Sequence, residues 1–241
     1  MAKVIICKDY EEASDKAFAE FKQYLQPGKV LGLATGSTPL GLYARMVKDH
    51  KENGTSYKDI KSFNLDEYVN LPITHPESYY AFMHRNLFDQ IDIPEENTHV
   101  PCGLGDLEAG AKKYDEMIDA CPVDCQILGI GSDGHIAFNE PGTAFDSPTH
   151  VTDLAESTIK DNARFFDFDM SKVPTQAVTQ GIGTIMKAKN IIIICTGANK
   201  ANAVKAMLEG PIDVSCPASI LQKHSSVTVI LDEAAASLLT K

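Results

Sequence analysis

One imidazole and two carboxyl groups fall close together in one short stretch of this sequence. Asp133, His135 and Glu140 directly follow a run of apolar residues, and Gly131 and Gly134 allow a tight backbone path between them. A carboxylate beside a histidine can fix the tautomer of the ring and tune its proton affinity. The ordinary alternative is an Asp-Gly turn with a histidine bonded within the fold. The position of the stretch after a predicted buried strand favours acid–base chemistry.

A second pair of acids, Asp66 and Glu67, directly follows the apolar segment Phe63-Asn64-Leu65. A carboxyl group that is partly removed from water has a raised pKa, and it can then take a proton from carbon beside a carbonyl group. The alternative is a surface turn or a helix cap. When the pair is considered alone, this alternative is the simpler interpretation.

A third segment, Thr35-Gly36-Ser37-Thr38-Pro39, has the small residues of a tight turn that opens a helix. Proline suits the first helical position, and the free amides at a helix N-terminus suit a phosphate group. The segment lacks the Walker lysine and the full dinucleotide fingerprint. An ordinary strand–helix turn capped by Ser37 or Thr38 is an equally common explanation.

A fourth segment places Lys200 at the start of another helix, shortly after Gly197. The helix dipole favours acids at this end, so an unpaired lysine there is unexpected. An anion bound between the lysine and the helix would explain it, and a solvated lysine is the alternative.

The elements that must position these residues follow from short β-branched apolar runs that alternate with amphipathic stretches. We expect strands at Val4–Cys7, Lys29–Ala34, Lys61–Leu65, Cys125–Ile130, Asn190–Thr196 and Val227–Leu231. We expect helices at Glu11–Leu25, Pro39–Lys51, Ser78–Gln90, Leu107–Ala120, Ala198–Glu209 and Pro217–Lys223. The pattern predicts an α/β fold of three layers with a doubly wound, mainly parallel sheet. All four segments then lie at the carboxyl edge of that sheet, where ligands of such folds bind.

The chain of 241 residues is expected to form one domain, because no linker divides it and a single core can grow to about this size. Residues 153–173, which include Arg164, are less regular than their surroundings. They are expected to be either a mobile cover over the site or a fixed surface excursion.

Composition narrows the possible partners. The net charge of -11 makes nucleic acid an unexpected partner, and the amino terminus does not resemble a secretory signal. The longest apolar run is far below the length of about 18 residues that a membrane helix requires. Six scattered cysteines form no zinc pattern. We expect a cytoplasmic protein with reduced thiols and no bound metal.

Five segments, in order along nearly the whole chain, resemble segments of the glucosamine-6-phosphate deaminase family: Leu31–Pro39, Phe63–Tyr68, His75–Tyr80, Gly131–Pro141 and Ser157–Phe166. The resemblance implies a modified Rossmann fold. It also implies conversion of glucosamine 6-phosphate and water to fructose 6-phosphate and ammonia in amino-sugar (N-acetylglucosamine) breakdown. The expected enzyme is an isomerising hydrolase of a carbon–nitrogen bond that uses no metal or organic cofactor.

The same resemblance implies a role for each site residue. Asp66 would be the base for enolisation and His135 the acid–base for ring opening, with Asp133 and Glu140 orienting and tuning the histidine. The substrate phosphate would lie against the Thr35–Thr38 loop, Arg164 and Lys200, and a guanidinium suits such a group because it binds phosphate in a fork.

The sequence departs from the family at one place. Hexameric members that respond to an allosteric activator carry basic residues just after the catalytic turn, where this chain has His150 and Thr152. Allosteric control is therefore not expected, and the shorter form of the family is compatible with a monomer. The sequence leaves open the oligomeric state and the tolerance of galactosamine 6-phosphate.

Two other functions remain possible at this point. A 6-phosphogluconolactonase resembles the same fold and binds a phosphorylated sugar, but it needs no base at C2. A sugar-phosphate sensor would keep the pocket without catalysis, which the presence of both Asp66 and His135 disfavours.

Overall fold

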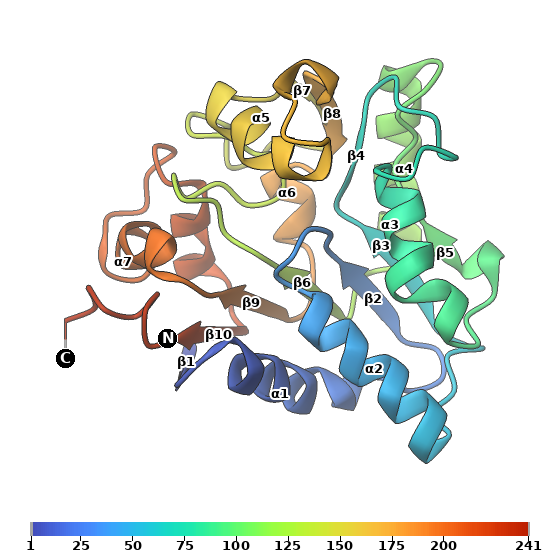
Figure 1. The fold of residues 1–241 in the computed structure, drawn as a ribbon, viewed down its shortest axis with the longest axis horizontal. Helices are drawn as coiled ribbons and strands as arrows, with labels where there is room; N and C mark the ends of the chain where they lie inside the picture. The colour runs from blue at the N-terminus through green and yellow to red at the C-terminus, as the bar shows by residue number, and fades with distance from the viewer. Residues whose placement is uncertain (1, 241) are drawn as a thin grey trace.

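The computed structural model describes residues 2–240, and its centre is a sheet of seven strands (Figure 1). The strands are β1 (Lys3–Cys7), β2 (Val30–Leu33), β3 (Lys61–Asn64), β5 (Thr98–His99), β6 (Cys125–Leu128), β9 (Ile191–Cys195) and β10 (Val227–Asp232). Their order is β1-β10-β9-β6-β2-β3-β5, and every neighbouring pair is parallel. The six strands predicted from the sequence are all present, with ends that differ by one or two residues.

Helices flank this sheet, as the sequence predicted. The predicted helices are present as α1 (Tyr10–Phe21), α2 (Leu40–Asn53), α3 (Tyr79–Asn86), α4 (Leu107–Ala120) and α7 (Ala201–Glu209). Two short helices, α5 (Glu156–Asn162) and α6 (Ile182–Ile185), were not predicted. Several are extended by short 3₁₀ turns, and Pro217–Lys223 is itself a 3₁₀ helix. Among residues 2–240, no helix has the length and apolar character needed to cross a membrane.

Strand β9 lies in the interior of the layered fold. All five of its residues, Ile-Ile-Ile-Ile-Cys, are buried, and it pairs with β10 on one side and β6 on the other. A strand with apolar side chains on both faces is stable only when both faces are covered. The unbroken isoleucine run therefore fixes β9 in the interior of a layered fold.

A second, antiparallel sheet was not predicted. Its strands are β4 (Asp66–Tyr68), β8 (Gln176–Thr179) and β7 (His150–Asp153), in the order β4-β8-β7. Each has only three or four residues, which gives little periodicity to detect. Figure 1 shows this small sheet and α5 gathered above the main sheet.

Residues 153–173 pack against this second sheet. They contain α5 and two 3₁₀ turns, Ala163–Phe165 and Met170–Lys172. Leu154, Ala163, Phe166 and Val173 share a separate apolar cluster with Tyr68 of β4. The segment is thus held by its own small core, and its possible movement remains a prediction.

Replacing Ile193 tests the buried position of β9. Its side chain is fully buried, so Ile193→Ala should lower the free energy of unfolding by about 2–5 kcal/mol through lost burial and a residual cavity. Ile6→Ala is the matched control, because Ile6 is 56% exposed and its loss should change stability by less than about 0.5 kcal/mol. Urea unfolding of both variants checks this, and equal losses would contradict the burial of β9.

Candidate active site

Six of the ten sequence-predicted site residues line a small cavity of about 150 Å³ beyond the carboxyl ends of β2, β3 and β6. The lining residues include Thr35, Gly36, Thr38, Asp66, Tyr79, His135, Asn162 and Arg164. A larger apolar groove lies between β1, α7 and the last described residues, but none of the predicted site residues lines it. The chemistry-bearing side chains therefore identify the smaller cavity as the candidate site.

Asp66 stands where the chain passes from the main sheet to the small one. It is 6% exposed, and no hydrogen bond reaches its carboxyl group from any other described residue. Burial and the nearby charge of Glu67 raise the pKa of Asp66 to about 8, and His135 acts in the opposite direction. A carboxyl group with such a pKa can exchange a proton near neutral pH.

Glu67, the adjacent acid, has a different environment. Its carboxylate accepts hydrogen bonds from the amides of Tyr79 and Tyr80 at 2.9 Å, and also from that of Tyr68. Burial raises the pKa of Glu67, although these three donors oppose the shift. Glu67 thus caps the start of α3 and links it to β4, as the helix-cap alternative supposed. Asp66 is not a helix cap.

The imidazole of His135 lies between two carboxylates. Its Nδ1 is 2.8 Å from Asp133 Oδ1 and 3.5 Å from Glu140 Oε2, and Asp133 also accepts the His135 amide. The Nδ1 contacts do not have the angles of a linear hydrogen bond, so their attraction is mainly that of an ion pair. Burial lowers the pKa of His135, but the two carboxylates outweigh it and raise the pKa to about 9. Burial raises the pKa of Asp133, but the nearby His135 outweighs this effect and holds the pKa of that carboxyl group well below its usual range.

The backbone around this group leaves room only for glycine. A Cβ atom on Gly131 would lie 2.3 Å from His135 Nδ1, and Gly134 has a φ of 91°. Gly131 is therefore required because the imidazole of His135 lies directly against the turn, and Gly134 because of its backbone conformation.

Glu140 connects the histidine to the segment 153–173. While Oε2 faces His135, Oε1 accepts a hydrogen bond from the Thr158 hydroxyl at 2.6 Å and a longer one of 3.4 Å from the Ala155 amide. Thr158 is 5% exposed. One carboxylate thus links α5 to the imidazole.

The same three residues have the donor types of a metal site. One ligand atom each from Asp133, His135 and Glu140 lies within 4.8 Å of the others. A metal would compete with the proton for the Nδ1 lone pair, which faces both carboxylates.

The Thr35–Thr38 loop has free donors. Within the part of the chain that the structure describes, none of its four amides donates a hydrogen bond. Gly36 has a φ of 82°, a conformation that side chains disfavour. Free amides at the entrance to α2 fit an anionic group.

Two basic residues lie near this loop. Arg164 lines the cavity, and its Nη2 is 3.5 Å from the Ser37 hydroxyl. Lys200 does not line the cavity, but burial lowers its pKa, and Arg164 and Asp133 are among the charges that act on it. Ser37 contacts Arg164, but neither Ser37 nor Lys200 is among the residues that line the cavity.

Several residues of the site were missed by reasoning from the sequence. Tyr79 and Asn162 line the cavity, and both are bonded to the Tyr68 hydroxyl, at 3.3 Å and 2.9 Å. Tyr79 belongs to the recognised segment His75–Tyr80, which was a usable signal. Tyr10, whose hydroxyl contacts the Ser37 and Thr38 carbonyl oxygens of the loop, had no signal at all in the sequence.

Taken together, a buried carboxyl group, an imidazole between two carboxylates and a loop of free amides are suited to acid–base catalysis on a small anionic ligand. The model of the family of glucosamine-6-phosphate isomerases and 6-phosphogluconolactonases matches residues 11–230. The chain belongs to this family.

Individual relatives agree with this assignment. The chain is 50% identical over 242 residues to a glucosamine-6-phosphate deaminase of Shouchella clausii, covering 99% of this chain and 98% of the relative. It is 48% identical to that of Corynebacterium kroppenstedtii, with 98% and 92% covered. The solved structure of a monomeric glucosamine-6-phosphate deaminase of the NagB superfamily superimposes with a TM-score of 0.96 at 43% identity, covering 98% of this chain and 100% of that one.

The charge of His135 can be tested by titration. NMR of the imidazole should give a pKa near 9 in the unmodified protein, and Asp133→Asn should lower it, because one carboxylate is removed while burial remains. His99 is the internal control, since burial lowers its pKa and the substitution should leave that value unchanged. A wild-type His135 that titrates at or below 6.5 would contradict the ion-pair geometry.

The sign of the effect on stability follows. The pKa of His135 in the folded protein is above the ordinary value of 6.5. The stabilisation of the folded state by protonated His135 is therefore fully present below pH 6.5 and is lost as pH rises through about 9.

Proposed function

We propose that this chain is a glucosamine-6-phosphate deaminase, which converts glucosamine 6-phosphate and water to fructose 6-phosphate and ammonia. The observation that carries the proposal is the shared cavity of Asp66 and His135, one a carboxyl group without a bonded partner among the described residues and the other an imidazolium. The high identity to proteins of that name supports the same substrate.

In the proposed mechanism, His135 first opens the sugar ring by relaying the proton of the C1 hydroxyl to the ring oxygen. Its two carboxylates keep the imidazole protonated at neutral pH, as a ring-opening acid requires. Asp133 and Glu140 orient the ring through Nδ1, which leaves Nε2 as the nitrogen available to the substrate.

The open aldehyde makes the proton at C2 acidic, and Asp66 removes it. Return of that proton to C1, together with transfer of one proton from the substrate nitrogen to O1, gives a C1 alcohol and an imine at C2. Water then adds to C2 and displaces the nitrogen as ammonia. The first part is an aldose–ketose isomerisation, in agreement with the name of the family. The description as a carbon–nitrogen hydrolase covers only the release of ammonia.

We assign the phosphate to the Thr35–Thr38 amides and Arg164, with Lys200 adding charge from the border of the site. The free amides and the position of the guanidinium support this assignment. Binding to backbone amides and a fixed fork explains how a protein of net charge -11 can hold an anion locally.

We also propose that residues 1–241 work as one catalytic domain, in the cytoplasm and as a monomer, with residues 153–173 as its cover. The structural similarity to a monomeric deaminase supports the proposal of a monomer. A lactonase function is less well supported, because ester hydrolysis leaves Asp66 without a task.

The deciding experiment supplies purified protein with glucosamine 6-phosphate in the presence of a chelator. Both ammonia and fructose 6-phosphate should form in equal amounts, and Asp66→Asn should lower kcat by about 10²–10⁴-fold, because a positioned base contributes about that much. Asp59→Asn, an exposed acid before β3, is the control and should keep full activity.

Near-normal turnover by Asp66→Asn would remove Asp66 from the base role. Hydrolysis of 6-phosphogluconolactone without release of ammonia from glucosamine 6-phosphate would favour the lactonase, and tight binding without turnover would favour a sensor.

The pH dependence of kcat/KM gives a separate check. Asp66 must be ionised and His135 protonated, so the profile should be bell-shaped, with an acid limb near pH 8 and an alkaline limb near pH 9. The ammonium of the bound substrate favours ionised Asp66, so the acid limb of kcat should lie at lower pH than that of kcat/KM. An acid limb at the usual carboxyl value of 3.8 would contradict the burial of a free Asp66.

A further inference from the structure

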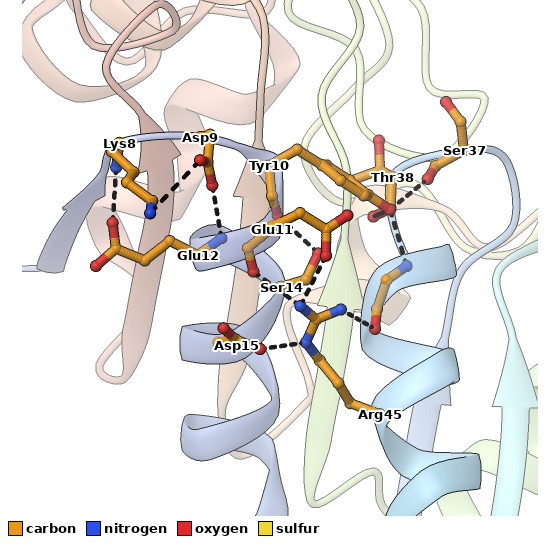
Figure 2. A network of polar contacts seen from close by, with 11 residues as sticks. Lys8, Asp9, Tyr10, Glu11, Glu12, Ser14, Asp15, Ser37, Thr38 and Arg45 are labelled. Atoms are coloured by element: carbon orange, nitrogen blue, oxygen red, sulfur yellow. Dashed lines mark hydrogen bonds and ion pairs between the residues drawn. The ribbon is translucent and has the colours of Figure 1, made fainter.

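The first residue of α1, Tyr10, contacts the Thr35–Thr38 loop and is not among the residues that line the cavity. Its hydroxyl lies 3.0 Å from the Ser37 carbonyl oxygen and 3.2 Å from that of Thr38, and it accepts a hydrogen bond of 2.8 Å from the Gly41 amide (Figure 2). The single hydroxyl proton can be donated to one of the two carbonyl groups at a time. One side chain therefore joins both carbonyls of the loop to the first turn of α2.

The position of Tyr10 is itself fixed. Asp9 caps the start of α1 by accepting the Glu12 amide at 2.9 Å. Arg45 of α2 bonds to Glu11 and Asp15 of α1 and to the Gly41 carbonyl group, and Figure 2 shows its guanidinium between the two helices. The two helices also touch closely, because a Cβ atom on Gly41 would lie 2.1 Å from the Ser14 hydroxyl oxygen.

This arrangement determines which backbone groups of the loop can face a ligand. Ser37 and Thr38 direct their carbonyl groups to Tyr10, while the four amides of Thr35–Thr38 donate to no described residue. A loop whose Ser37 and Thr38 carbonyl groups face Tyr10 and whose amides are free is suited to an anion, because carbonyl oxygens would repel it.

We infer that Tyr10 is a positioning residue of the phosphate subsite, which acts by holding the carbonyl groups of Ser37 and Thr38 away from the bound phosphate. The inference rests on the proposed function in that it takes this loop to bind the phosphate group of a sugar phosphate. Tyr10 itself touches no ligand.

The test is Tyr10→Phe, which keeps the ring and removes only the hydroxyl. Loss of a hydrogen bond worth about 0.5–1.5 kcal/mol should raise KM for glucosamine 6-phosphate roughly 2- to 12-fold and leave kcat nearly unchanged, since the phosphate binds equally in ground and transition states. Calorimetric titration should show the same loss of affinity for fructose 6-phosphate.

The matched control is Tyr57→Phe, which removes a buried hydroxyl that donates to the Met46 carbonyl group, away from the cavity. Urea unfolding reports the stability of both variants. Tyr57→Phe should lose stability without a change in KM, so a general loosening of the fold cannot account for the effect at Tyr10.

The two proposals fail in different ways. If the protein releases no ammonia but Tyr10→Phe still binds fructose 6-phosphate more weakly, the proposed function is wrong and the inference holds. If deamination is normal and both KM and fructose 6-phosphate affinity are unchanged in Tyr10→Phe, or if kcat alone falls, the inference is overturned. Absence of any fructose 6-phosphate binding to the wild-type protein overturns it as well.

Discussion

Leu65 is bonded to both sheets of this molecule. Its amide donates to the Leu33 carbonyl group at the end of β2, and its carbonyl group accepts the amide of Gln180, which follows β8. The next residue, Asp66, therefore enters the small sheet at a fixed point above the carboxyl edge of the large one. The cavity depends on this junction, because it brings a buried acid to the edge where the glycine turn and the amide loop already meet.

Burial and charge oppose each other throughout the site. Asp66 is buried without a bonded partner, so removal from water makes its charged form costly. His135 is also largely buried, but two carboxylates favour its charged form. Both pKa values are thus raised, but for opposite reasons: the charged form of Asp66 is disfavoured by burial, whereas the charged form of His135 is stabilised by its two carboxylates.

Much of this arrangement could be predicted from the sequence. Strand β9 carries an unbroken apolar run, and the rule that ligands lie beyond the carboxyl ends of parallel strands brought Asp66, His135 and the Thr35–Thr38 loop together. The second sheet could not be predicted, because β4 has three residues and two of them are acids. The different roles of Asp66 and Glu67 depend on which carboxylate meets the amides of α3, and this is a matter of tertiary contact. The contacts of Tyr10 likewise join residues that are far apart in sequence and carry no local pattern.

The adjacent acids at the start of β4 also make the site sensitive to the length of the chain before them. Successive residues of a strand point to opposite faces, so a slip of one position would exchange Asp66 and Glu67. The residue then facing the cavity would be a longer glutamate, and an aspartate would have to reach the amides of Tyr79 and Tyr80. Insertions and deletions between β3 and β4 should therefore be far less tolerated than point changes of comparable size, even though the fold could accommodate both.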